Sequence, residues 1–352
     1  REEIKMRKVF LHYGIIFLLA AGIFLISQDI PIFKAPLHKY SETKLAMGTV
    51  VRFDVCSENS QEEAVYNAFK TAWKSIENTS RMMSVFDERS DISKINTSKT
   101  KPVSVDKKVY LLLAKAIYFS TISDGAFDVT VWPLVQLWKN SKEKNVLPRK
   151  RDIEKILKLT GASQIKLLKN YNVQLSHPTV KLDLSGIAKG YAVDEAAAVF
   201  RQSGFSDFLI DAGGDIYAGG TNCEGRAWRV GIRDPRDNTR MIDTVLVSNK
   251  AITTSGDYEQ FFEIQGKRYA HIINPKTGFP SDEVVSATVI AHTAQDADAL
   301  STALCVLGPQ QGVELINALG PDVASLILTP ASEREGYLRT FSKEYKNFQV
   351  KE

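Results

Sequence analysis

The segment from Phe208 to about Ala291 is the part of the sequence that most constrains the fold. It consists of short runs typical of strands, separated by glycine turns, such as FLIDAGGDIYAGG, AWRVGIRDP and VSATVIAH. Helical patterns lie on both sides of this segment. Strands and helices are therefore mixed without the regular alternation of a doubly wound sheet, and no internal repeat is present. The pattern predicts an α+β fold.

The elements outside that segment are predicted from periodicity and from their end signals. Residues 164–176 predict a hairpin, and residues 180–204 predict a strand, a tight turn and a helix that ends near Gly204. A helix is expected from Thr293 to Gly308, followed by another helix and a strand to Pro330. Further helices are expected over residues 61–80, 106–125 and 152–161.

The first 28 residues predict a membrane anchor or a signal segment. A charged start is followed by an almost wholly apolar run from Val9 to Ser27. Such a run is long for a signal core and just long enough to span a bilayer. No small-residue cleavage site or lipid-bearing cysteine follows it, which favours the anchor. Residues 29–43 are expected to be a linker and residues 44–352 the folded domain, facing outward from the cytoplasmic membrane in the cell envelope.

Charge and cysteine content limit the classes of partner. The formal net charge is +4 over 352 residues, and no basic stripe with interleaved aromatic residues is present, so we expect no nucleic-acid partner. The three cysteines are too few for a disulfide scaffold, and their spacing does not indicate a zinc site. Cys305 lies within an apolar helical run and is expected in the core.

Asp298 and Thr302 raise the question of a metal site. They lie four residues apart in a helix that is apolar nearly all round, so both face the same side. A carboxylate and a hydroxyl one turn apart can bind one edge of a Mg²⁺ octahedron. Alternatively, the helix dipole favours Asp298 near the helix start, while Thr302 bonds a backbone carbonyl.

Two further stretches contain candidate functional residues. In LDLSGIAKGYAVD, Asp183 is expected to end a strand, with Gly186 in the turn and Lys189 near the helix start. Helix starts attract phosphate, although an exposed lysine on a capped helix gives the same pattern. In YAHIINPKTGFP, His271 is expected on a strand before a loop rich in proline and glycine. It is either a base or an ordinary structural histidine.

Seven stretches, taken in order, show a resemblance. They are AMGT, MSVFDERSDISKIN, DGAFDVTVWPLVQLW, LDLSGIAKGYAVD, LIDAGGDIYAGG, AHIINPKTGFP and ADALSTALCVLG. Together they closely resemble the ApbE family, the FAD:protein FMN transferases of the bacterial envelope, over roughly Lys44 to Pro330. The resemblance implies a T-fold-like architecture of mixed β-sheets with flanking helices and an FAD cleft between two parts. It also implies Mg²⁺-dependent transfer of FMN from FAD to a Thr or Ser hydroxyl of an acceptor flavoprotein, with release of AMP.

The resemblance also implies roles for individual residues. The metal is expected on the Gly186 carbonyl, Asp298 and Thr302, and His271 is the candidate base, with Asp298 as the second candidate. Phe86 stands where the family often has a tyrosine, which keeps the stacking and removes one hydrogen bond. The residues expected to contact FAD are Met47, Phe86, Ala126, Phe127, Asp128, Asp183, Lys189 and Ile273.

Two other functions remain open at this point. An FAD pyrophosphatase would use water in place of the acceptor hydroxyl on the same ligands. A non-catalytic FAD-binding envelope protein would not need Asp298, Thr302 and His271, and the presence of all three favours an enzyme. The expected partners are FAD, an acceptor subunit with an S/T-G-A-T/S-type motif, and the membrane through the N-terminal segment.

Overall fold

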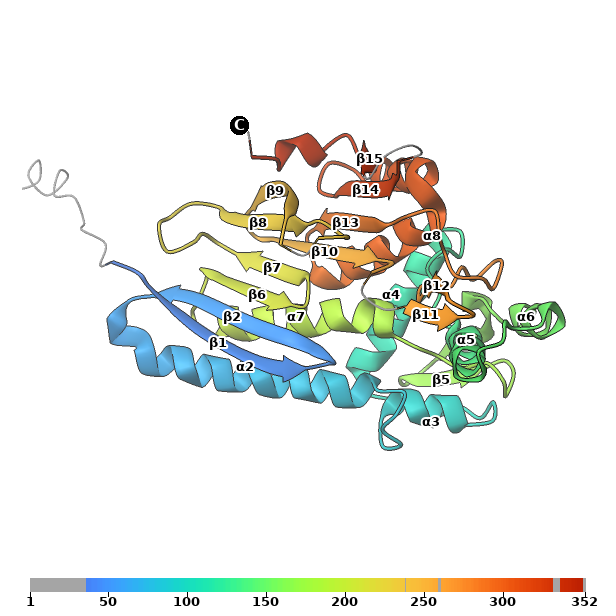
Figure 1. Cartoon of the computed structure of the whole chain (residues 1–352). Coiled ribbons are helices and arrows are strands. Elements are labelled where there is room, and N and C mark those ends of the chain that lie inside the picture. The colour runs from blue at the N-terminus through green and yellow to red at the C-terminus, as the bar shows by residue number, and fades with distance from the viewer. Residues whose placement is uncertain (1–35, 238, 259–260, 332–335, 351–352) are drawn as a thin grey trace, which may run out of the picture. The chain divides into compact units, whose positions relative to one another are not determined.

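An eight-stranded antiparallel sheet lies at the centre of the protein (Figure 1). The computed structural model describes residues 36–350, except residues 238, 259–260 and 332–335. The strands of the sheet, in spatial order, are β1 (His38–Ala46), β2 (Thr49–Ser57), β6 (Phe208–Ala212), β7 (Asp215–Gly219), β10 (Lys250–Gly256), β13 (Ser286–Ala291), β14 (Ala324–Pro330) and β15 (Tyr337–Phe341).

Smaller hairpins and helices surround this sheet. The hairpins are β4 (Ile165–Leu168) with β5 (Asn172–Leu175), joined by β3 (Val103–Ser104); β8 (Trp228–Arg233) with β9 (Met241–Val247); and β11 (Phe261–Ile264) with β12 (Lys267–Ala270). The α-helices are α2 (Glu62–Met83), α3 (Asp91–Thr97), α4 (Lys107–Ile122), α5 (Trp132–Lys144), α6 (Lys150–Leu157), α7 (Ser185–Gln202) and α8 (Ala294–Ala318), and 3₁₀ turns occur at Asn59–Gln61, Ala162–Gln164 and Tyr345–Asn347.

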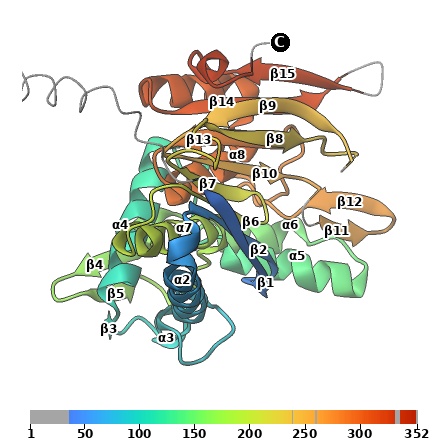
Figure 2. The same cartoon turned by 90° about the vertical axis from the view of Figure 1, so that its left-hand side faces the viewer.

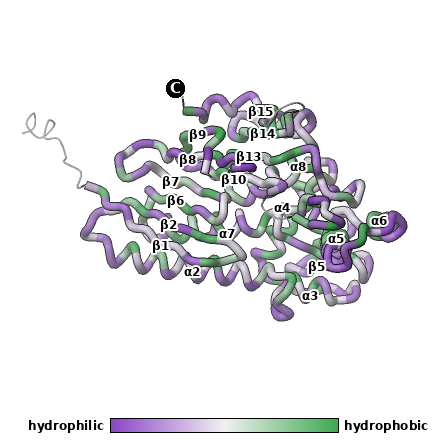
Figure 3. Tube along the Cα trace, in the orientation of Figure 1, coloured by the Kyte–Doolittle hydropathy of each residue, from purple (hydrophilic) through white to green (hydrophobic). Residues whose placement is uncertain are grey.

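Alternation along the central strands gives the sheet an apolar surface on both faces. On β13, Val289 packs into the core under α2, α7 and α8, while Ile290 packs into a second core under the β8–β9 hairpin. On β14, Ile327 packs into the first of these cores and Leu326 into the second. Figure 2 shows α4 and α7 on one side of the sheet, and Figure 3 shows hydrophobic and hydrophilic residues alternating along α2.

A third, smaller core lies outside the sheet. It joins α5, α6 and the β11–β12 hairpin through Leu134, Trp138, Ile153, Phe262 and Ile264. The indole Nε1 of Trp138 donates to the carbonyl of Gly278 at 2.9 Å, which fastens the loop after β12 to α5. Gly278 has φ +74°, and an added Cβ would lie 2.4 Å from Ile153, so this contact requires glycine.

The α+β prediction is confirmed, and most predicted elements are present. The hairpin over residues 164–176 forms as β4 and β5, and Gly204 follows the end of α7 with φ +87°. The expected helix from Thr293 also forms. Thr293 is its N-cap, and the non-helical Gly308 (φ 77°, ψ 178°) separates it from the helix that follows, so that α8 is two helices joined at a kink.

Three details of the sequence prediction are wrong. Residues 180–183 are not a strand, because the Asn96 side chain bonds both the N–H and the carbonyl of Leu182 and so replaces a strand partner. The helix expected to end at Gly161 already ends at Leu157, and β12 ends at Ala270, so His271 is in the following loop.

The N-terminal predictions fall mostly outside the described residues. The expected anchor over residues 1–28 cannot be placed, whereas the second half of the expected linker, from His38, is part of β1. In the part of the chain that the structure describes, no helix has both the length and the hydropathy needed to cross a membrane.

A disulfide joins Cys56 at the end of β2 to Cys223 in the loop after β7. The two residues are 167 positions apart in the sequence, which hid the pairing from the sequence analysis. Cys305 is buried in the main core, as predicted. The bond closes a loop that contains much of the protein, so it strongly lowers the conformational entropy of the unfolded chain.

We expect the double variant Cys56→Ala, Cys223→Ala to lower the free energy of unfolding by about 2–4 kcal/mol. Urea unfolding of the domain, with and without a reductant, measures the difference. The reductant is expected to destabilise the wild type and to leave the double variant unchanged. Equal sensitivity of both proteins to reductant would contradict the assignment.

Candidate active site

One cavity of about 820 Å³ gathers every residue that the sequence analysis assigned to FAD, metal or catalysis. Its walls come from the β1–β2 turn, the end of α2, the loop before α5, the start of α7, strand β10, the loop after β12, and α8. The assigned residues in these walls are Met47, Phe86, Ala126, Phe127, Asp128, Asp183, Gly186, Lys189, His271, Ile273, Asp298 and Thr302.

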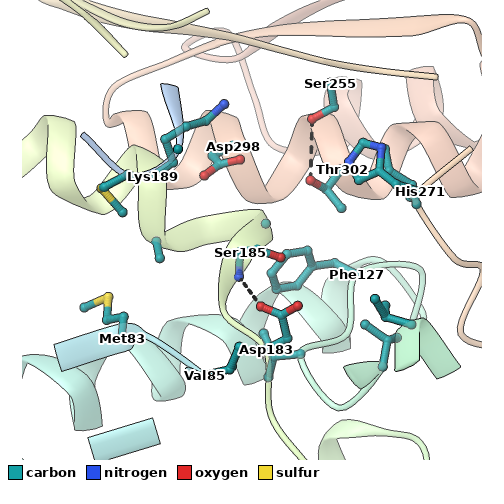
Figure 4. A pocket seen from close by; sticks show the side chains of 18 of the residues that line it. Met83, Val85, Phe127, Asp183, Ser185, Lys189, Ser255, His271, Asp298 and Thr302 are labelled. Carbon is teal, nitrogen blue, oxygen red and sulfur yellow. Dashed lines mark hydrogen bonds between the residues drawn. The ribbon is translucent and has the colours of Figure 1, made fainter. Parts of the chain in front are cut away.

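Asp298 and Thr302 project from α8 into the cavity (Figure 4). Asp298 is 4% exposed, and its Oδ2 accepts a hydrogen bond from the backbone N–H of Gly190 at 3.0 Å. Burial raises the pKa of Asp298 to about 6, while the Lys189 charge and the Gly190 N–H act in the opposite direction. A carboxylate in this state gains from a cation that replaces its lost hydration.

The sequence left open that the Thr302 hydroxyl donates to a backbone carbonyl. Among the described residues Thr302 has no such partner. Its hydroxyl lies 3.5 Å from the Ser255 hydroxyl of β10, and Ser255 in turn lies 2.8 Å from the Ser301 hydroxyl. A Cβ on Gly186 would lie 3.3 Å from the Thr302 Oγ1, so the backbone of Gly186 passes directly beside Thr302. Ser255 was missed by the sequence analysis, because a serine in a strand carries no local signal.

Asp298, Thr302 and the backbone of Gly186 fit a magnesium ion. They offer a carboxylate, a hydroxyl and a backbone carbonyl, all hard oxygen donors. Among the described residues no group of three or more His, Cys, Asp or Glu could hold a metal. Mg²⁺ does not need such a group, since it commonly takes one or two carboxylates with the rest of its ligands from substrate phosphates and water.

The close approach of α7 and α8 positions Asp298. An added Cβ on Gly190 would lie 2.3 Å from the Ala294 carbonyl oxygen, so only glycine fits there. One turn further along α7, the Asp194 carboxylate accepts the N–H groups of Ala294 and Gln295 at 2.8 and 2.9 Å and caps α8. Neither contact was visible from sequence spacing, since about a hundred residues separate the partners.

Asp183 is a half-buried carboxylate and Asp128 a buried one, and the hydrogen bonds of both lie within the fold. Asp183 Oδ1 accepts the N–H of Ser185, the first residue of α7, at 2.9 Å, which removes one donor from the phosphate site expected at that helix start. Asp128 Oδ1 accepts the N–H and hydroxyl of Thr130 at 2.7 and 2.6 Å. Burial raises the pKa of both carboxyls. Both still line the cavity, and their predicted contacts with FAD stay predictions.

The remaining assigned side chains lie at the walls and rim of the cavity. Phe86 is 79% exposed and lies edge-on to Trp132, with 5.8 Å between ring centroids. The Lys139 ammonium lies 4.8 Å from the Trp132 ring. This aromatic pair at the rim offers a flat apolar surface for a ring system.

Comparison with known proteins identifies the family. The ApbE family model matches residues 47–327. The chain belongs to the ApbE family. It is 31% identical over 346 residues to the FAD:protein FMN transferase of Escherichia coli K12, covering 95% of this chain and 97% of that protein, and 32% identical over 314 residues to that of Treponema pallidum, covering 84% and 86%.

Solved structures of the family share the fold. The ApbE protein of Thermotoga maritima superposes with a TM-score of 0.80 at 33% identity, covering 89% of this chain and all of that one. The flavin transferase ApbE of Vibrio cholerae gives a TM-score of 0.77 at 28% identity, with the same coverage. The fold prediction and the family resemblance are therefore confirmed.

We expect Gly190→Ala to destabilise the protein by about 1–3 kcal/mol, because the methyl group forces α7 away from α8. The same shift moves Asp298, so FAD and Mg²⁺ affinity should fall as well. Gly336→Ala is the matched control, since open space surrounds a Cβ at that position. Thermal unfolding and calorimetry measure both effects, and a Gly190→Ala protein as stable as the control would contradict the packing argument.

Proposed function

We propose that the protein transfers the FMN half of FAD to a Thr or Ser hydroxyl of an acceptor flavoprotein, with release of AMP. The observation that carries the proposal is the gathering of Asp298, Thr302, Lys189 and His271 in one cavity. Family membership supports it, since the curated relatives are named FAD:protein FMN transferases. These side chains supply oxygen ligands, a cation for phosphate and a base, which phosphoryl transfer requires.

The reaction breaks the phosphoanhydride bond of FAD and forms a phosphoester bond to the acceptor. The acceptor oxygen attacks the phosphorus on the FMN side of the pyrophosphate, the bond to the AMP oxygen breaks, and the hydroxyl proton passes to a base. Asp298, Thr302 and the Gly186 carbonyl would hold Mg²⁺ at the pyrophosphate. When bound, Mg²⁺ neutralises the charge that develops on the phosphate oxygens. The Lys189 ammonium neutralises the same oxygens from α7.

His271 is proposed as the base for the acceptor hydroxyl. A neutral imidazole can take this proton. The Trp138–Gly278 hydrogen bond ties the loop that carries His271 to α5. Asp298 is the weaker candidate, because a carboxylate oxygen bound to the metal is a poorer proton acceptor.

The proposed location is the cell envelope, with the domain anchored to the cytoplasmic membrane and facing outward. Two observations support it. The apolar run from Val9 to Ser27 is long enough to span a bilayer. The Cys56–Cys223 disulfide is typical of proteins that fold in an oxidising compartment.

A mass assay distinguishes transfer from hydrolysis. The protein is incubated with FAD, Mg²⁺ and an acceptor domain that carries an S/T-G-A-T/S-type motif, and the acceptor is weighed intact. The proposal predicts an acceptor that gains FMN, together with free AMP. Free FMN and AMP with an unmodified acceptor would instead identify an FAD pyrophosphatase.

We expect Asp298→Ala to abolish Mg²⁺-dependent FAD cleavage, because the metal loses its only charged protein ligand. Thr302→Val removes a neutral ligand and should raise the Mg²⁺ concentration needed for half-maximal rate without abolishing turnover. Asp296→Ala, two residues away and paired with Lys115 instead of lining the cavity, is the control. Unchanged turnover by Asp298→Ala would refute the metal assignment.

We expect His271→Ala to slow FMN transfer by at least about a hundredfold, with little change in FAD affinity. The wild-type rate should rise with pH as the imidazole loses its proton, and this rise should be absent from the variant. Ionisation of Asp298, whose pKa burial raises to about 6, should add a rise in Mg²⁺ affinity that persists in the variant. His177→Ala, an exposed histidine outside the cavity, is the control. A collapse of FAD affinity in His271→Ala would make His271 a binding residue.

A further inference from the structure

Asp215 lies behind the wall of the cavity and contacts two residues that line it. It is the first residue of β7 and follows the turn Gly213–Gly214, whose φ angles are 64° and 98°. The Asp211 carboxylate accepts the Gly214 N–H at 2.9 Å, and Gly213 packs so closely on Thr49 that a Cβ would lie 2.0 Å from its hydroxyl oxygen. The turn therefore holds Asp215 at a fixed depth, where it is 2% exposed.

Three charged side chains meet at this point from three different elements. The Lys189 ammonium of α7 lies 3.4 Å from Asp215 Oδ1, and the Asp298 carboxyl of α8 lies beside the Asp215 carboxyl. Lys189 and Asp298 line the cavity, whereas Asp215 is absent from its lining. Figure 4 shows the Lys189 side chain close to Asp298 at one end of the cavity. Asp215 is thus shielded from substrate by the two residues that it contacts.

The charge balance of this group depends on Asp215. Two carboxylates share one ammonium, so when all three groups are ionised the cluster carries a net negative charge that attracts a divalent cation. Without Asp215, the Lys189 ammonium would have only the Asp298 carboxylate as a partner. At low solvent exposure the attraction between these two charges is strong. Lys189 would then compete directly with a metal for Asp298.

We propose that Asp215 is a positioning residue that holds the Lys189 ammonium away from Asp298 and so keeps the Asp298 carboxylate available for Mg²⁺. The inference rests on the proposed function, in which Asp298 is a metal ligand. It assigns to the GGD turn a role in metal affinity that is exerted through Lys189, without contact between Asp215 and substrate.

The test is a double-mutant cycle on Mg²⁺ affinity, measured by calorimetry on the FAD-free protein. The four proteins are the wild type, Asp215→Asn, Lys189→Met and the double variant. We expect Asp215→Asn to raise the Kd for Mg²⁺ by at least about tenfold, and to raise it by at most about threefold when Lys189 is already methionine. Asp207→Asn, at the other end of the same hairpin, where the side chain accepts the Thr221 N–H, is the matched control.

Three results would overturn the inference. An equal loss of Mg²⁺ affinity in both backgrounds would mean that Asp215 acts on the metal by itself. Unchanged affinity in Asp215→Asn would mean that Lys189 does not compete. A fall in the thermal midpoint of Asp215→Asn well beyond that of Asp207→Asn, without recovery of the transfer rate at saturating Mg²⁺, would mean a structural role.

The cycle separates this inference from the proposed function. If the wild type does not bind Mg²⁺, both the metal assignment in the proposed function and this inference are refuted. Normal Mg²⁺ binding by the wild type with no coupling between Asp215 and Lys189 would remove the inference alone. Recovery of the wild-type transfer rate by Asp215→Asn at saturating Mg²⁺ would support both.

Discussion

The approach of α7 to α8 at Gly190 is the constraint on which the candidate site depends. The two helices touch so closely that a methyl group would overlap the Ala294 carbonyl oxygen, and the same glycine donates its N–H to Asp298. Lys189 precedes Gly190, and the Asp194 cap of α8 follows one turn later. The positions of Lys189 and Asp298 and the register between the two helices therefore follow from one packing contact.

Sequence reasoning identified the residues of the site but not the contacts that hold them. Asp298 and Thr302 could be paired because a helix places residues four apart on one face. Gly190, Asp194 and Ser255 could not be found in this way, because their partners lie about 50 to 100 positions away. Local periodicity contains no information about such distances. Only the family resemblance predicted that motifs far apart in the sequence meet at one site.

The fold shows the same division. Elements with a strong local signal, such as the helix from Thr293 and the hairpin over residues 164–176, were predicted with nearly correct ends. Residues 180–183 were assigned to a strand from their alternation, yet the Asn96 side chain bonds the backbone of Leu182 where a neighbouring strand would otherwise pair. The Cys56–Cys223 bond was unpredictable for a similar reason, since only the tertiary fold brings β2 and the loop after β7 together.

The loop that carries His271 has a core of its own. Trp138 holds it through Gly278, and α5, α6 and the β11–β12 hairpin pack around this contact apart from the main sheet. The two ends of the cavity are thus supported by different parts of the structure. One end is formed by α7 and α8, and the other is held by this small cluster. Substitutions in this cluster can therefore alter the His271 end of the cavity while Lys189 and Asp298 keep their positions on α7 and α8. This separation lets one end of the cavity vary in evolution independently of the other.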